Sequence, residues 1–153
     1  MISNILLIDD HPAILSGYLS VLNFNERDIE LKPTFCHNCE DAFNTITKPE
    51  NANFFDFIFI DRSLPPFPKM KLKYGEDLAI LAKEHQNKAK IIILTAHSEA
   101  FIIYDILYKA KPNGLIIKSD ASGDILLDAF HSILDNKTFY SATVTEKMKE
   151  LLA

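Results

Sequence analysis

Three aspartates that follow two short apolar runs are the residues of this sequence best suited to chemistry. Asp9 and Asp10 come directly after the run 5–8, and Asp61 follows the run 57–60. Runs that are apolar throughout are typical of strands buried on both faces of a parallel sheet, and ligands bind at the carboxyl ends of such strands. Three carboxylates gathered there repel one another unless a cation neutralises them. The sequence therefore predicts a hard divalent metal such as Mg²⁺.

Two further strand ends are expected to add a hydroxyl and a cation. Thr95 follows the next apolar run, and Lys118 follows the last one. A metal, a carboxylate nucleophile, a hydroxyl and a fixed ammonium suit phosphoryl transfer onto a carboxylate, where catalysis is mostly positioning and charge neutralisation. Mg²⁺ would bridge Asp10, Asp61 and a phosphoryl oxygen, while Thr95 and Lys118 would bind the remaining oxygens.

The elements that must position these groups alternate along the chain. Apolar runs predict strands at residues 5–8, 29–36, 57–60, 90–94 and 115–117. Apolar residues at helical spacing predict helices at 11–23, 38–47, 75–85, 99–110 and 124–136. Five strands alternating with five helices predict a (βα)5 chain, an α/β fold with a doubly wound parallel sheet between two layers of helices.

Local signals mark the ends of two of these helices. Asn38, with Asp41 three residues later, is expected to cap the second helix, and Ser98 is expected to cap the fourth. The fourth helix should stop near Lys111, because Pro112 disfavours the helical conformation in the residue before it.

Composition narrows the class of protein. The 153 residues and 48% hydrophobic content fit one domain with a sizeable core. The net charge of −5 argues against a surface built for nucleic-acid phosphates. The sequence has no apolar stretch of the roughly 18 residues that a membrane span needs, and no signal-peptide pattern after Met1. We expect a cytoplasmic domain without a membrane partner.

Four motifs together resemble the receiver domain of two-component response regulators. They occur in the family's order within residues 1–136 and read Ile8-Asp9-Asp10-His11-Pro12, Asp61-x-x-Leu64-Pro65, Leu94-Thr95-Ala96-His97 and Gly114-Leu115-Ile116-Ile117-Lys118-Ser119. The resemblance implies a flavodoxin-like fold with sheet order 2-1-3-4-5. It also implies a signalling module rather than an enzyme.

The resemblance further implies a role for each site residue. Asp61 would accept a phosphoryl group from a sensor histidine kinase, Thr95 would be the switch hydroxyl, and Lys118 would be the family's lysine. The Mg²⁺ ligands would be Asp9, Asp10, Asp61 and the backbone carbonyl of Ser63. The fourth helix, fifth strand and fifth helix would form the output surface and support a homodimer.

The sequence is most similar to the LuxR/NarL-type branch of that family. Asp10-His11-Pro12 and the tail Phe139-Tyr140-Ser141 carry this likeness. Members of the branch usually continue into a helix-turn-helix DNA-binding domain. We expect a receiver domain at 1–136 and a C-terminal tail or linker helix at 137–153. The chain is then either the N-terminal part of a transcriptional regulator, with DNA contacted only through a downstream domain, or a stand-alone receiver acting by protein–protein contact.

Two departures from the family pattern affect this interpretation. The switch aromatic should lie three residues before the lysine, where this chain has Leu115, and the connection 62–74 is longer than usual. A receiver acting as a phosphate-independent scaffold therefore stays open. A haloacid-dehalogenase-like phosphatase fits less well, since its Asp-x-Asp motif does not match Asp9-Asp10-His11.

Three smaller features lead to separate hypotheses. His97 and Ser63 are expected to set the lifetime of the phosphoryl group. Cys36 and Cys39 lack a second pair of zinc ligands at finger spacing and are expected to be reduced thiols. The fourth helix is apolar around more than one face, which predicts either an exposed partner surface or burial under the C-terminal tail.

Overall fold

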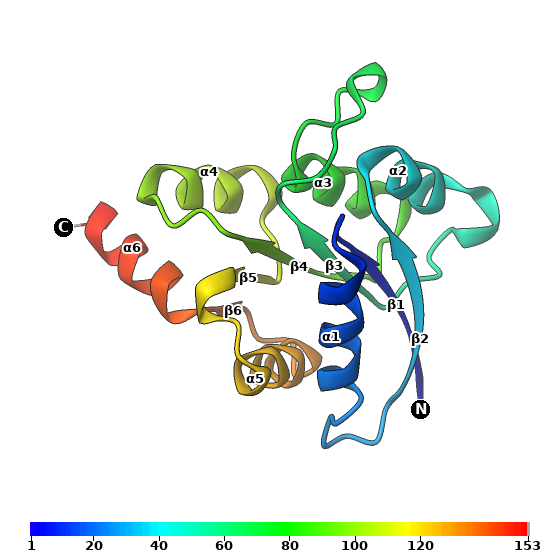
Figure 1. The fold of residues 1–153 in the computed structure, drawn as a ribbon, viewed down its shortest axis with the longest axis horizontal. Helices are drawn as coiled ribbons and strands as arrows, with labels where there is room; N and C mark the ends of the chain where they lie inside the picture. The colour runs from blue at the N-terminus through cyan, green and yellow to red at the C-terminus, as the bar shows by residue number, and fades with distance from the viewer. Residues whose placement is uncertain (153) are drawn as a thin grey trace.

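The computed structural model describes residues 1–152, and Figure 1 shows a parallel sheet between two layers of helices. The strands are β1 (Ile2–Ile8), β2 (Glu30–Cys36), β3 (Phe57–Asp61), β4 (Lys90–Thr95), β5 (Gly114–Ile117) and β6 (Phe139–Tyr140). Their order is β2-β1-β3-β4-β5-β6, and every pair is parallel. The predicted flavodoxin-like order 2-1-3-4-5 is confirmed. The short strand β6, which the sequence patterns did not reveal, is added at the edge beside β5.

The helices divide between the two faces of the sheet. They are α1 (Pro12–Leu22), α2 (Cys39–Thr47), α3 (Gly75–His85), α4 (Ala100–Ala110), α5 (Gly123–Leu134) and α6 (Ala142–Leu152). Helices α1 and α5 cover one face, whereas α2, α3 and α4 cover the other, where α6 also packs (Figure 1). Successive strand residues point to opposite faces of the sheet. Leu7 therefore packs in the core under α1 and α5, and Leu6 packs in the core under α2, α3 and α4.

The helix ends confirm two of the local predictions and correct one. The Asn38 side chain accepts the backbone N–H of Asp41 at 2.7 Å, as expected of a cap. Helix α4 ends at Ala110, and Lys111 takes a left-handed conformation with φ of 45°. The prediction that Ser98 caps α4 is wrong. Glu99 occupies the capping position without a side-chain bond, which leaves Ser98 one residue too early.

The long connection 62–74 is an ordered loop that projects beyond α3 (green in Figure 1). Phe67 and Leu72 pair in antiparallel fashion, each donating its N–H to the other's carbonyl, at 2.8 and 3.2 Å. The Phe67 ring also packs edge-on against Phe43 of α2 at 5.8 Å between centroids. The backbone of Gly75 closes the loop by donating to the carbonyl of Arg62 at 2.8 Å.

The C-terminal tail packs onto the edge of the sheet. Strand β6 pairs with β5, and α6 contacts both α4 and β5. Of the apolar tail residues, Val144 is fully buried, whereas Leu152 is 86% exposed. Ala153, the last residue of the expected tail, lies outside the described residues. Within residues 1–152, none of the helices combines the length and the hydropathy needed to cross a membrane.

Candidate functional site

The carboxyl ends of four strands bring the predicted site residues to one edge of the sheet. In the ladder Ile8 pairs with Ile60, so Asp9 and Asp61 follow at the same level of neighbouring strands. Thr95, the last residue of β4, pairs with Ile117, the residue before Lys118. Parallel pairing thus aligns groups that are up to 109 positions apart in the sequence.

One ammonium joins the two buried acids of this edge. The Nζ of Lys118 lies 3.0 Å from Oδ1 of Asp61 and 3.5 Å from Oδ2 of Asp9. The side chains of Asp9 and Asp61 are 2% and 3% exposed, whereas that of Lys118 is 24% exposed. The Asp61 carboxylate also accepts the backbone N–H of Ser63 at 3.3 Å, again through Oδ1.

Burial and charge act against each other on these groups. Burial raises the pKa of Asp61 above its ordinary value, and the charge of Asp9 adds to this, although Lys118 and Ser63 partly oppose it. Burial by itself lowers the pKa of Lys118, but Asp61 and Asp9 outweigh it and the net pKa is raised. The site therefore holds a protonated lysine beside Asp61, whose ionised form is disfavoured by burial.

Asp10 and His11 form the exposed side of the site. The Nδ1 of His11 lies 3.0 Å from an oxygen of Asp9 and 3.0 Å from an oxygen of Asp10. The backbone N–H of His11 also donates to Asp9 at 2.9 Å. Asp9, Asp10 and His11 bring ligand atoms within 4.8 Å of one another, a group that does not include Asp61. His11, to which no role was assigned from the sequence, bridges two of the predicted metal ligands.

The donor chemistry of this site fits Mg²⁺. Carboxylate oxygens are the ligands this ion prefers, and the adjacent residues Asp9 and Asp10 both supply them here. Burial of Asp9 and Asp61 makes neutralisation by a cation favourable. Asp9, Asp10 and Asp61 are the carboxylates of this site that could hold such an ion.

Thr95 and His97 lie on the loop that follows β4. The fully buried hydroxyl of Thr95 accepts the backbone N–H of His97 at 3.0 Å, which leaves its own proton free to donate. The Nδ1 of His97 lies 3.5 Å from a carboxylate oxygen of Glu99, at the outer side of the loop.

Tyr18 of α1 is a neighbour of the site that the sequence patterns did not single out. Burial is the main cause that raises the pKa of its phenol, with smaller effects from Lys118, Asp9 and Asp61. In the sequence, Tyr18 was only one of the apolar residues at helical spacing in the predicted helix 11–23. The packing of α1 against the sheet brings Tyr18 close enough to Lys118 and the two acids for their charges to act on it.

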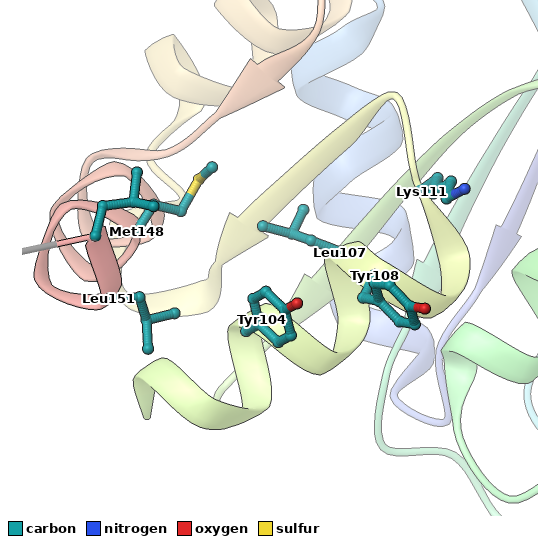
Figure 2. A pocket seen from close by; sticks show the side chains of 7 residues that line it. Tyr104, Leu107, Tyr108, Lys111, Met148 and Leu151 are labelled. Atoms are coloured by element: carbon teal, nitrogen blue, oxygen red, sulfur yellow. The ribbon is translucent and has the colours of Figure 1, made fainter.

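The sequence left open whether the apolar residues of helix α4 form an exposed surface or are buried under the C-terminal tail, and the structure combines both. Ile103 and Ile106 are fully buried, whereas Tyr104 and Tyr108 are 56% and 68% exposed and stack on each other with centroids 6.0 Å apart. Figure 2 shows Tyr104 facing Leu151 of α6, with Tyr108 further along α4 toward Lys111. The groove between the two helices has a volume of about 520 Å³. The groove is lined by Tyr104, Leu107, Tyr108, Lys111, Met148, Leu151 and Leu152.

Leu115, at the position of the family's aromatic, is fully buried in β5 and pairs with Tyr140 of β6. Cys36 and Cys39 are both buried and free, as predicted. Burial, chiefly, raises the pKa of Cys39 to about 11, so its thiol stays protonated at neutral pH.

Comparisons with known proteins agree with the fold. No family model matches the sequence. The oxygen regulatory protein NreC of Staphylococcus epidermidis is 24% identical over 147 residues, and that of Staphylococcus haemolyticus is 25% identical over 147 residues. Each alignment covers 94% of this chain and 60% of the relative, so the chain spans about three fifths of their length.

Three of the similar solved structures illustrate the shared architecture. A LuxR-family two-component response regulator from Aurantimonas sp. SI85-9A1 superimposes with a TM-score of 0.77 at 19% identity, covering 98% of this chain and 97% of that one. The isolated REC domain of RcsB from Salmonella enterica serovar Typhimurium gives 0.77 at 22% identity, with coverages of 96% and 99%. The signal receiver domain of the putative response regulator NarL from Mycobacterium tuberculosis gives 0.69 at 18% identity, with coverages of 88% and 98%. The likeness to LuxR/NarL-type receiver domains is confirmed.

Proposed function

We propose that this chain is the receiver domain of a two-component response regulator of LuxR/NarL type, and that it accepts a phosphoryl group on Asp61. The observation that carries the proposal is the buried contact of 3.0 Å between Asp61 and Lys118, with Asp9 beside it at the ligand-binding edge of a receiver fold. The phosphoryl donor is a sensor histidine kinase.

In the proposed reaction an Asp61 oxygen attacks the phosphorus, and the P–N bond to the kinase histidine breaks with its electron pair leaving on nitrogen. The contacts from Lys118 and Ser63 are both made to Oδ1, so Oδ2 is the attacking oxygen. The ammonium of Lys118 neutralises charge on the phosphoryl oxygens, and the Thr95 hydroxyl donates a hydrogen bond to one of them.

Mg²⁺, when bound, supplies the charge neutralisation that a phosphoryl group needs beside several carboxylates. Asp9, Asp10 and Asp61 would hold it, together with the backbone carbonyl of Ser63. His11 must then give up its contacts with Asp9 and Asp10, which its 62% exposed side chain has room to do. Ser63, whose N–H donates to Asp61, and His97, on the loop after Thr95, are the residues proposed to set how quickly water removes the group.

The proposed output surface lies around α4. Strand β6 covers the edge of β5 and α6 packs against α4, so the exposed apolar part of the expected surface is the outer side of α4 with its groove (Figure 2). A second copy of this chain is the proposed occupant, as in the homodimer expected from the sequence. The same proposal divides the chain into a receiver domain at 1–136 and a tail at 137–153. It also includes a cytoplasmic location and transcriptional output through a DNA-binding domain that is not part of this chain.

Incubation with acetyl phosphate and Mg²⁺, followed by intact-mass measurement, tests the function. We expect one phosphoryl group per chain, lost on standing, and no mass gain in Asp61→Asn. The matched control Asp128→Asn, on the exposed side of α5, should gain mass as the wild type does. Turnover of many equivalents of acetyl phosphate would instead indicate a phosphatase, and an unchanged wild-type mass would indicate a scaffold.

A further inference from the structure

A hydroxyl from the C-terminal tail is bonded to both sides of the turn that carries Lys118. The Oγ of Ser141 accepts the backbone N–H of Ile117 at 3.0 Å and donates to Oδ2 of Asp120 at 2.7 Å. Ile117 directly precedes Lys118, and Asp120 ends the short 3₁₀ turn 118–120. Ser141 itself is 1% exposed.

We infer that Ser141 is a positioning residue for Lys118, and that through it α6 is coupled to the phosphoryl site. This inference rests on the proposed function and deepens it. It assigns the tail beyond residue 136 a part in the site, which the sequence motifs confined to residues 1–136.

The Ser141 hydroxyl continues the sheet where β6 ends. The backbone N–H of Ser141 donates to the carbonyl of Leu115 at 3.1 Å, and β6 stops at Tyr140. On the edge of β5 that faces β6, the next N–H belongs to Ile117. It is buried, and the Ser141 side chain is its acceptor. Without that hydroxyl the buried N–H of Ile117, the residue before Lys118, has no hydrogen-bond acceptor, and an unsatisfied buried N–H is costly.

Asp120 ties the same turn to the first turn of α6. Its carboxylate accepts the backbone N–H of Thr143 through Oδ2 and the Thr143 hydroxyl through Oδ1, both at 2.9 Å. A carboxylate at the amino end of a helix is also favoured by the helix dipole. Lys118, its turn and the start of α6 are therefore held as one unit by Ser141, Asp120 and Thr143.

This unit offers a route for signal transmission that does not need an aromatic at position 115. The Lys118 ammonium contacts Asp61 directly, so a phosphoryl group added there displaces it from its present position. The hydrogen-bonded turn passes that displacement to α6, which lines the groove beside Tyr104 (Figure 2). In the other direction, the docking of α6 sets the position of Lys118.

The test compares Ser141→Ala with Ser141→Thr, which keeps the hydroxyl, and with Thr145→Ala on the exposed side of α6. Phosphorylation rates at several concentrations of acetyl phosphate, with Mg²⁺, are read by intact mass, and hydrogen exchange of α6 is measured before and after. We expect Ser141→Ala to lower the saturating rate about tenfold, because misplacing a charge-neutralising group slows the chemical step. We also expect it to abolish the exchange response of α6. Ser141→Thr should restore both, and Thr145→Ala should match the wild type.

If Ser141→Ala does not fold, Asp120→Asn breaks the same unit at a less buried residue and should give the same two changes. A wild-type rate together with a wild-type α6 response in the folded variant would overturn the inference. Failure of the wild type to gain mass is a separate result, which would remove the proposed function itself.

Discussion

Lys118, at the end of β5, reaches past β4 and places its ammonium 3.0 Å from Oδ1 of Asp61, at the end of β3. The same ammonium lies 3.5 Å from Asp9, at the end of β1. Three strands that are far apart in the sequence thus share one ion cluster. The energetics of this cluster determine what substitutions around it should do.

Replacing Lys118 by Met should slow phosphorylation of Asp61 by acetyl phosphate about a hundredfold, since it removes a charge-stabilising donor from a preorganised site. The loss also removes the hydrogen bond that lowers the pKa of Asp61. Time-resolved intact mass measures the rate. Lys109→Met, on the surface of α4, is the control and should keep the wild-type rate. A wild-type rate in Lys118→Met would contradict the proposed role of the lysine.

Replacing Gly75 by Ala should destabilise the protein by about 1–3 kcal/mol, the usual cost of overpacking. A Cβ at this position would lie 2.6 Å from the carbonyl oxygen of Asp61 and 2.9 Å from the Cα of Arg62. Urea denaturation measures the change in the free energy of unfolding. The control Gly17→Ala, in an exposed part of α1 with nothing within 4 Å of the new methyl group, should stabilise by up to about 1 kcal/mol.

Replacing Arg62 by Met should cost about 3–5 kcal/mol of unfolding free energy, because it leaves a buried carboxylate uncompensated. The Nε of Arg62 donates to Oε2 of Glu76 at 3.1 Å, with both side chains under 10% exposed. The other oxygen of Glu76 is already buried without a partner among the described residues. Thermal unfolding checks this prediction. Arg27→Met breaks the exposed pair with Asp135 and should change the midpoint far less.

Asp120→Asn should destabilise the protein by about 1 kcal/mol at pH 7, since it weakens the bonds to Ser141 and Thr143. Burial alone would raise the pKa of Asp120, but these hydrogen bonds outweigh it and the net pKa lies below the ordinary 3.8. A carboxyl with a lowered folded-state pKa contributes stability above its unfolded pKa and loses that contribution as the pH falls through the folded value.

Denaturation of the wild type and Asp120→Asn should therefore show a difference that is full near pH 7 and shrinks below about pH 4. A difference that stays constant from pH 7 to pH 2.5 would show that the carboxylate charge plays no part in holding the start of α6.

The double substitution Tyr104→Ser with Tyr108→Ser should prevent dimerisation of the phosphorylated chain, because it removes the two stacked, exposed rings of the α4 surface. Size-exclusion chromatography with light scattering, before and after acetyl phosphate, measures the mass in solution. Phe24→Ser removes a ring just beyond α1 that is even more exposed, at 79%, and serves as the control. Dimers that persist in the double variant would place the interface elsewhere.

Much of the candidate site follows from local sequence patterns. Apolar runs without alternation indicated buried parallel strands, and the residue after each run then had to lie at the carboxyl edge of the sheet. Asp9, Asp61 and Lys118 lie together for that reason, since parallel pairing aligns strand ends whatever the length of the connections. The Asn38 cap was predictable from a local pattern as well, because Asn38 and its partner Asp41 are only three residues apart.

The remaining features depend on contacts that no local pattern contains. His11 bridges Asp9 and Asp10 because of the side-chain rotamers that these residues adopt at the exposed side of the site. Ser141 reaches the backbone N–H of Ile117, just before Lys118, only because two tail residues pair with β5 and bring it there. A strand of two residues carries too little periodicity to be recognised.

The sequence by itself determined the parallel α/β architecture and which acids, hydroxyl and lysine reach the sheet's carboxyl edge, because side-chain period and chain alternation are local properties. Only the tertiary structure decided how those groups are paired, that α6 docks on α4, and that the tail hydroxyl holds the lysine turn. Those outcomes depend on packing between segments far apart in the chain, where side-chain rotamers and burial are set jointly.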